Sequence, residues 1–146
     1  MFNKENLSDI WKDLLSDNSE GEFHVERTIN IYPLEIKLRI LKPLDKYSII
    51  ISDDSGYHSN DILTKNKYFK VSQKEEDGKR ALVVELNDNF FSNEFILFSK
   101  IILEISQKSV SASDAISTIA KKLKDFEKFI SSPTKRFNFE KRMGLM

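Results

Sequence analysis

Few side chains in this sequence have the types and spacing that catalysis or metal binding requires. The two histidines, His24 and His58, have no acidic residue at a metal-binding spacing, so we expect solvated or structural side chains. Asp53 and Asp54 precede Gly56, but the further acidic ligands of a calcium loop are missing, which favours a plain turn. The sequence has no cysteine, which excludes thiol nucleophiles, disulfides and cysteine zinc sites.

One tripeptide, Glu35-Ile36-Lys37, has the Glu-x-Lys form that metal-dependent nucleases use. In such enzymes a carboxylate and a lysine on one strand face hold a magnesium ion and a water molecule. The chemistry also needs a second acidic residue at the start of a neighbouring strand, and none is clear here. We therefore expect Glu35, Lys37 and Arg39 to form the solvated face of an amphipathic strand.

Basic residues gather at the C-terminal end. From Lys121 onward there are eight basic and three acidic residues, so this part carries +5 and the rest of the neutral chain −5. Such an end can contact nucleic-acid phosphates, and a solvated helix face followed by a linker is the simpler alternative. The candidate DNA contacts are Lys121, Lys122, Lys128, Lys135, Arg136, Lys141 and Arg142.

Composition places the chain among ordinary globular domains. Its 146 residues are 40% hydrophobic and 32% charged, which suits one folded domain with a real core. The zero net charge argues against a general polyanion binder. The N-terminus lacks the features of a signal peptide, and no apolar run is long enough for a membrane span. These features predict a cytoplasmic protein without a membrane partner.

The residues from 80 to 105 should form the middle of the core. Residues 81–86 are apolar and rich in β-branched side chains, which predicts a buried strand. Residues 87–89 can turn the chain and cap a helix. The helix that follows carries an apolar stripe at spacings of four and three. Its members are Phe91, Phe95, Phe98, Ile102 and Ile105.

The remaining elements predict an α+β fold. Apolar spacing predicts a leading helix over residues 6–17 and a last long helix that starts at Ser111 or Ser113 and ends near residue 131. Alternation predicts strands at 23–29, 34–40, 47–51 and 68–71, in addition to 81–86. Short connections favour an antiparallel β-meander of about five strands, with a leading helix and two C-terminal helices packed on it. We expect one domain over residues 1–132, and over 133–146 a linker and the start of a truncated helix.

The order of these motifs resembles a known family. The features that carry the resemblance are Trp11 in the first helix, Arg80-Ala81-Leu82-Val83-Val84-Glu85-Leu86, Asn87-Asp88, a helix with Phe95, Phe98 and Ile102, and the close Asn138-Phe139-Glu140-Lys141-Arg142-Met143-Gly144-Leu145-Met146. They resemble the N-terminal region of the bacterial PD-(D/E)XK motif proteins, found among restriction and phage-defence genes. The family often has tryptophan near the end of the third helix, where this chain has Phe126 or Phe129.

The resemblance implies an N-terminal accessory domain of a restriction-type DNA endonuclease, which positions DNA or partner subunits. The chain ends before the helix glutamate and the later acidic and Glu-x-Lys elements of that family, so no catalytic residue can be carried over. Mg²⁺ would belong to the missing nuclease core, and we expect no cofactor in this chain. The alternative is a free-standing protein-interaction or dimerisation module. The expected partners are accordingly DNA, other subunits of a defence system, or a second copy of this chain. A free-standing enzyme is the last of the hypotheses, because the sequence shows no set of residues that could form a catalytic site.

Overall fold

The computed structural model describes residues 4–17, 21, 23–42, 44–52, 64–65, 69–76 and 78–131. The helices are α1 (Lys4–Leu15), α2 (Ser92–Lys108) and α3 (Ala112–Ser131), with a short 3-10 turn, η2 (Asn89–Phe91), before α2. The strands are β1 (Phe23–Ile31), β2 (Leu34–Lys42), β3 (Lys46–Ser52), β4 (Thr64–Lys65), β5 (Phe69–Glu76) and β6 (Lys79–Leu86). The linker and helix start predicted over residues 133–146 lie outside the described residues.

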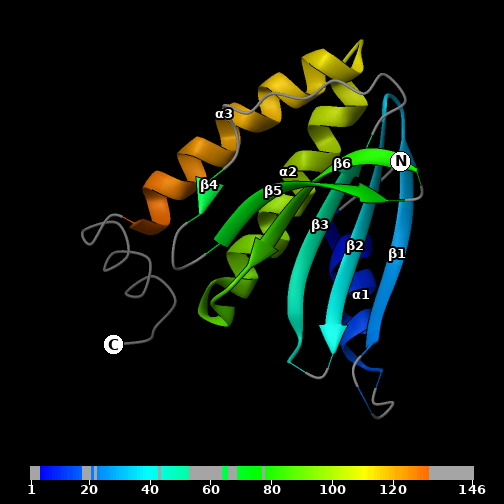
Figure 1. Cartoon of the computed structure of the whole chain (residues 1–146), viewed down its shortest axis with the longest axis vertical. Coiled ribbons are helices and arrows are strands. Elements are labelled where there is room, and N and C mark those ends of the chain that lie inside the picture. Colours follow the sequence, from blue (N-terminus) through cyan, green and yellow to red (C-terminus); the bar gives the residue numbers. More distant parts are fainter. Residues whose placement is uncertain are drawn as a thin grey trace.

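The strands form one sheet with the order β1-β2-β3-β6-β5-β4 (Figure 1). All neighbouring strands are antiparallel. The predicted α+β class is confirmed, with its antiparallel sheet, leading helix and two C-terminal helices. Five strands have seven to nine residues, and β4 has only two. The central contact joins β3 to β6, two strands that are not consecutive in the sequence.

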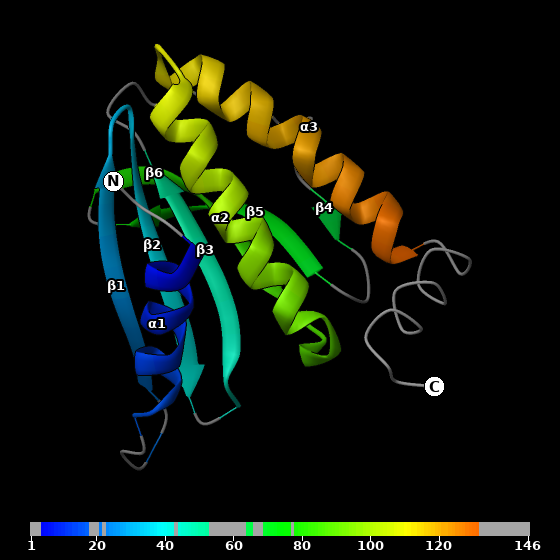
Figure 2. The same ribbon diagram turned by 180° about the vertical axis from the view of Figure 1, so that it is seen from behind.

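Helices α1 and α2 cover one face of the sheet, and α3 packs beside α2 (Figure 2). The covered face carries alternate strand residues, such as Ile36, Leu38 and Ile40 on β2, all fully buried. The stripe predicted for α2 is confirmed as core-facing, because Phe95, Phe98 and Ile102 are buried. No described helix lies over the opposite face, where Ile50, Ala81 and Val83 form a small second cluster.

Polar groups determine where the helices begin and how they attach to the sheet. Ser111 Oγ accepts a hydrogen bond from Asp114 N at 3.2 Å, so Ser111 is the cap of α3 rather than Ser113. Lys42 Nζ donates to the carbonyl oxygen of Leu15 at 2.8 Å, at the C-terminal end of α1. Ser106 Oγ donates to the carbonyl oxygen of Ile31 and ties α2 to β1.

The largest difference from the predicted strand lengths is at β5. β5 continues to Glu76 instead of ending at residue 71. Residues 72–76 are all polar, so the sequence alternation that predicts a strand is absent there. Pairing with β6 holds them extended, from Phe69 opposite Leu86 to Glu76 opposite Lys79.

Candidate functional site

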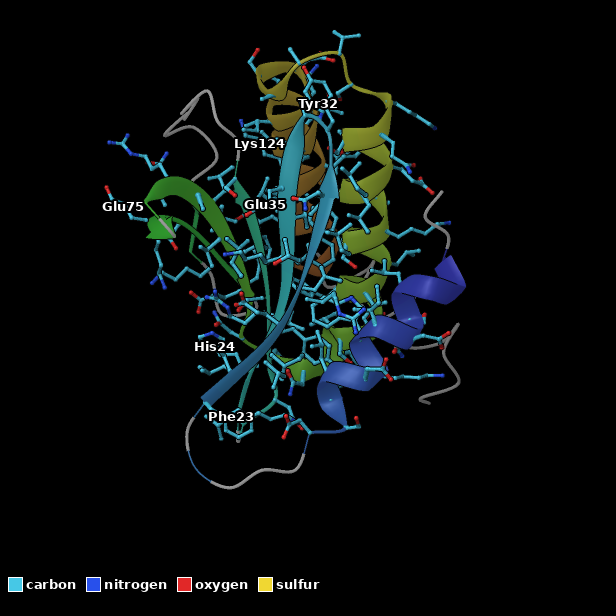
Figure 3. The ribbon with its side chains drawn as sticks, turned by 90° about the vertical axis from the view of Figure 1, so that its right-hand side faces the viewer. Phe23, His24, Tyr32, Glu35, Glu75 and Lys124 are labelled. Atoms are coloured by element: carbon cyan, nitrogen blue, oxygen red, sulfur yellow. The ribbon has the colours of Figure 1, made fainter. Side chains whose placement is uncertain are left out.

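The predicted DNA contacts fall into two groups. Lys121, Lys122 and Lys128 are exposed on α3, as is Lys124, which Figure 3 labels. Lys135, Arg136, Lys141 and Arg142 lie outside the described residues.

The α3 lysines form a row along a rigid element. Lys121, Lys124 and Lys128 are three and four residues apart, so they share one side of the helix and span about 10 Å along its axis. Within the described part of the chain, none of them forms an ion pair. Exposed Asp125 lies between them in sequence and reduces the local positive potential. The row is suited to contact with phosphates and not to base recognition.

Ring packing keeps that row in place. Phe126 stacks on Phe98 of α2 with ring centres 5.0 Å apart and planes 8° apart. The same ring lies 5.5 Å from the ring of Phe69 on β5. Phe126 is half-buried against the core, and its two ring contacts fix α3 to both the sheet and α2.

The first and last residues of the Glu-x-Lys tripeptide, Glu35 and Lys37, lie on the sheet face opposite the helices, whereas Ile36 faces the helices. Glu35 is paired with Asn30 and Ser52, and Lys37 with Thr28 and Ile50, in the strand register. Lys37 is only 7% exposed, so the prediction of a fully solvated strand face is wrong at this position. The error arises because strand alternation identifies a face without showing whether neighbouring strands bury it.

The acidic neighbour of this lysine is Glu26 on β1. Glu26 Oε2 lies 4.0 Å from Lys37 Nζ, and Glu26 Oε1 accepts from Arg39 Nε at 2.9 Å. His24, which Figure 3 labels, has its Nε2 atom 3.5 Å from the same Oε1. The Glu26 carboxylate thus forms ion pairs with Lys37 and Arg39, which is typical of a structural network. Among the described residues, no group of three or more histidine and acidic side chains could hold a metal ion.

A groove of about 440 Å³ runs between α1 and α2. Its lining is mainly apolar, and the residues are Leu7, Ser8, Trp11, Lys12, Leu15, Asn93, Glu94, Ile96, Leu97 and Lys100. Leu97 is 47% exposed at its edge. This groove was not predicted from the sequence, although one signal was available. Leu97 is a large apolar residue outside the core stripe of its own helix.

Beneath the groove lies an aromatic cluster. The Trp11 ring centre is 5.2 Å from that of Tyr47 and 6.3 Å from that of Phe95. Trp11 Nε1 donates to Ser99 Oγ at 3.2 Å. Burial raises the pKa of the Tyr47 hydroxyl, although a hydrogen bond with Ser92 opposes the change. These groups form a rigid floor, because their polar atoms have partners and their rings interlock.

The groove also contains a carboxylate with unusual surroundings. Both carboxylate oxygens of Glu94 are buried and make no hydrogen bond of good geometry. Burial raises the pKa of Glu94, and its own backbone N–H opposes this by a smaller amount. The groove's cations are Lys12, which is exposed, and Lys100, whose Nζ lies 3.4 Å from Glu104 Oε1.

Replacing Glu94 by glutamine is expected to stabilise the protein at low concentration and pH 7 by at most about 1 kcal/mol, since the side chain as a whole is only half-buried and solvent limits the penalty. A raised pKa means that the folded state holds this proton more tightly than the unfolded state. The wild type is therefore favoured at low pH and loses stability as pH rises from the ordinary value of 4.5 through the raised pKa. Urea unfolding at pH 4 and pH 7 measures the effect, which should vanish at pH 4. An equal change at both values would contradict it.

Comparison with known proteins found no matching family model, no matching curated protein and no matching solved structure. The resemblance to the PD-(D/E)XK motif proteins is therefore carried by sequence motifs alone. No helix in the described residues is long and apolar enough to cross a membrane.

Proposed function

We propose that this domain is a non-catalytic accessory domain of a restriction-type DNA endonuclease that helps to position DNA. The observation that carries the proposal is the row of exposed lysines on α3, which have no ion-pair partner among the described residues and in which Lys121 and Lys128 are seven residues apart on one side. The sequence resemblance supports the same conclusion. Mg²⁺ and the cleavage chemistry would belong to a nuclease core outside this chain.

The geometry limits what the lysine row does. Phosphate contacts orient a protein on a duplex and contribute most of its non-specific affinity, but they carry no sequence information directly. Because α3 is fixed by the Phe126 contacts, its lysines meet the backbone without a large ordering cost. We therefore expect weak, salt-dependent and sequence-independent binding by the isolated domain, with Kd values of roughly 10⁻⁴ to 10⁻⁶ M.

Replacing Lys121 and Lys128 together by glutamine should weaken duplex binding and reduce the slope of log affinity against log salt by about 2, because each phosphate contact releases a counterion. Fluorescence anisotropy with a labelled duplex, at several salt concentrations, measures both quantities. The pair Lys135→Glu and Arg136→Glu applies the same test to predicted contacts outside the described residues.

The matched control is the pair Lys12→Gln and Lys108→Gln, which removes two exposed charges from α1 and α2. This control should lower the affinity less and leave the slope closer to that of the wild type. Equal slopes in the wild type and in both test pairs would show that the basic end does not contact DNA.

A second candidate function is a protein-interaction module. It is favoured by the α1–α2 groove, where a fixed aromatic floor lies beside the exposed side chain of Leu97. Exposed apolar surface of this kind is typical of sites that bind another protein.

A further inference from the structure

The surface of α2 beside the groove has a self-complementary arrangement. Leu97 is the exposed apolar residue, Glu94 lies three residues before it, and Lys100 lies three residues after it. At 1.5 Å of rise per residue, the acidic and basic groups are each about 4.5 Å along the helix from Leu97, in opposite directions. An anion and a cation are thus equally spaced about an apolar centre.

This spacing has a consequence for two copies of α2 packed antiparallel. When Leu97 meets Leu97 of the second copy, each Glu94 comes level with the second copy's Lys100. The flexible four-carbon stem of lysine can cover the remaining lateral distance. The same packing places Leu97 of one copy at the groove beside Trp11 and Ile96 of the other.

The interaction would give Glu94 the partner that it lacks in one copy, and it would give Lys100 an alternative to its own partner. The Glu94 carboxylate oxygens have no hydrogen bond of good geometry. Lys100 has a partner in Glu104, but this is a partly exposed pair one helical turn away, and such pairs exchange easily. A cation from outside is the group that the buried carboxylate requires.

We infer that the α1–α2 groove is a homodimer interface, formed by antiparallel packing of α2 on α2 of a second copy around Leu97. The inference rests on the second candidate function above and is independent of DNA binding. The occupant is a second copy because the groove itself supplies both the donor and the acceptor at matching positions. A different protein with an amphipathic helix would have to provide that pattern anew.

The decisive experiment is sedimentation of the 146-residue chain without DNA, from about 1 to 500 µM. The expected result is a concentration-dependent rise in mass from 17.0 kDa towards twice that value. Leu97→Glu should weaken dimerisation at least tenfold with an unchanged circular dichroism spectrum. A mass that stays at 17.0 kDa throughout would overturn the inference.

A matched control uses Val110→Glu, because Val110 is 84% exposed between α2 and α3 and does not line the groove. This variant should dimerise like the wild type, and a loss equal to that of Leu97→Glu would overturn the proposed location.

The charge pattern has a separate test, because two variants that each dimerise weakly should dimerise with each other. Lys100→Glu places two anions together in its homodimer, and Glu94→Lys places two cations together. Mixing the two variants recreates both opposite-charge pairs, so the mixture should dimerise more tightly than either variant alone. A mixture that behaves as the average of its components would overturn the proposed register. Since the carboxylate oxygens of Glu94 are buried, circular dichroism must first show that Glu94→Lys is folded.

Discussion

Replacing Trp11 by alanine is expected to destabilise the domain by about 3–5 kcal/mol. The side chain is fully buried, and its ring contacts both Tyr47 and Phe95. Truncation removes a large buried apolar area and leaves a cavity between α1 and the sheet, which rigid aromatic neighbours cannot refill. Denaturant unfolding followed by circular dichroism at 222 nm measures the loss.

Trp11→Phe is the matched variant for this prediction. It keeps an aromatic ring in the cluster and removes the Nε1 donor that Ser99 Oγ accepts from. Ser99 Oγ still donates to the carbonyl oxygen of Ile96 at 2.6 Å, so its hydroxyl is not left unpaired. We expect a loss of roughly 1–2 kcal/mol. An alanine variant as stable as the phenylalanine variant would show that the ring contacts contribute little.

Replacing Phe98 by alanine is expected to cost about 3–5 kcal/mol and to loosen α3 preferentially. Phe98 is 4% exposed and stacks directly on Phe126, so its loss removes the surface on which α3 packs. Amide hydrogen exchange measures the regional effect. Protection should fall further in α3 than in the paired strands β3 and β6, because helices held by few buried contacts open locally first.

The neighbouring residue supplies the control. Leu97→Ala also truncates an apolar side chain of the same helix to alanine, although a smaller one, and that side chain is 47% exposed. Under dilute conditions this variant should lose no more than about 0.5 kcal/mol. If both variants lose equal stability, or if exchange rises uniformly after Phe98→Ala, α3 is not held by the Phe98–Phe126 stack.

The fold was predicted best where a feature depends on residues that are close together in the sequence. Helical spacing identified the buried side of α2, because side chains three and four residues apart share one side of a helix. The capping of α3 by Ser111 was also one of two predicted alternatives, since a cap bonds to backbone within three residues. Both features depend on neighbours in the sequence.

The candidate sites divide in the same way. The exposure of the α3 lysines was predictable from the amphipathic pattern of that helix in the sequence. The groove needs two helices that are about eighty residues apart in the chain. The burial of Lys37 depends on the strands that pair on both sides of it, Thr28 on one side and Ile50 on the other.

The sequence by itself therefore determined the periodicity of each element, the apolar face of each helix and the basic character of the C-terminal end. Only the tertiary structure decided that β6 pairs with β3, that polar residues 72–76 are extended, and that the carboxylate oxygens of Glu94 are buried near an exposed Leu97. The physical reason is that periodicity reports which side of an element avoids water. The identity of the surface that covers this side depends on packing between residues far apart in the chain.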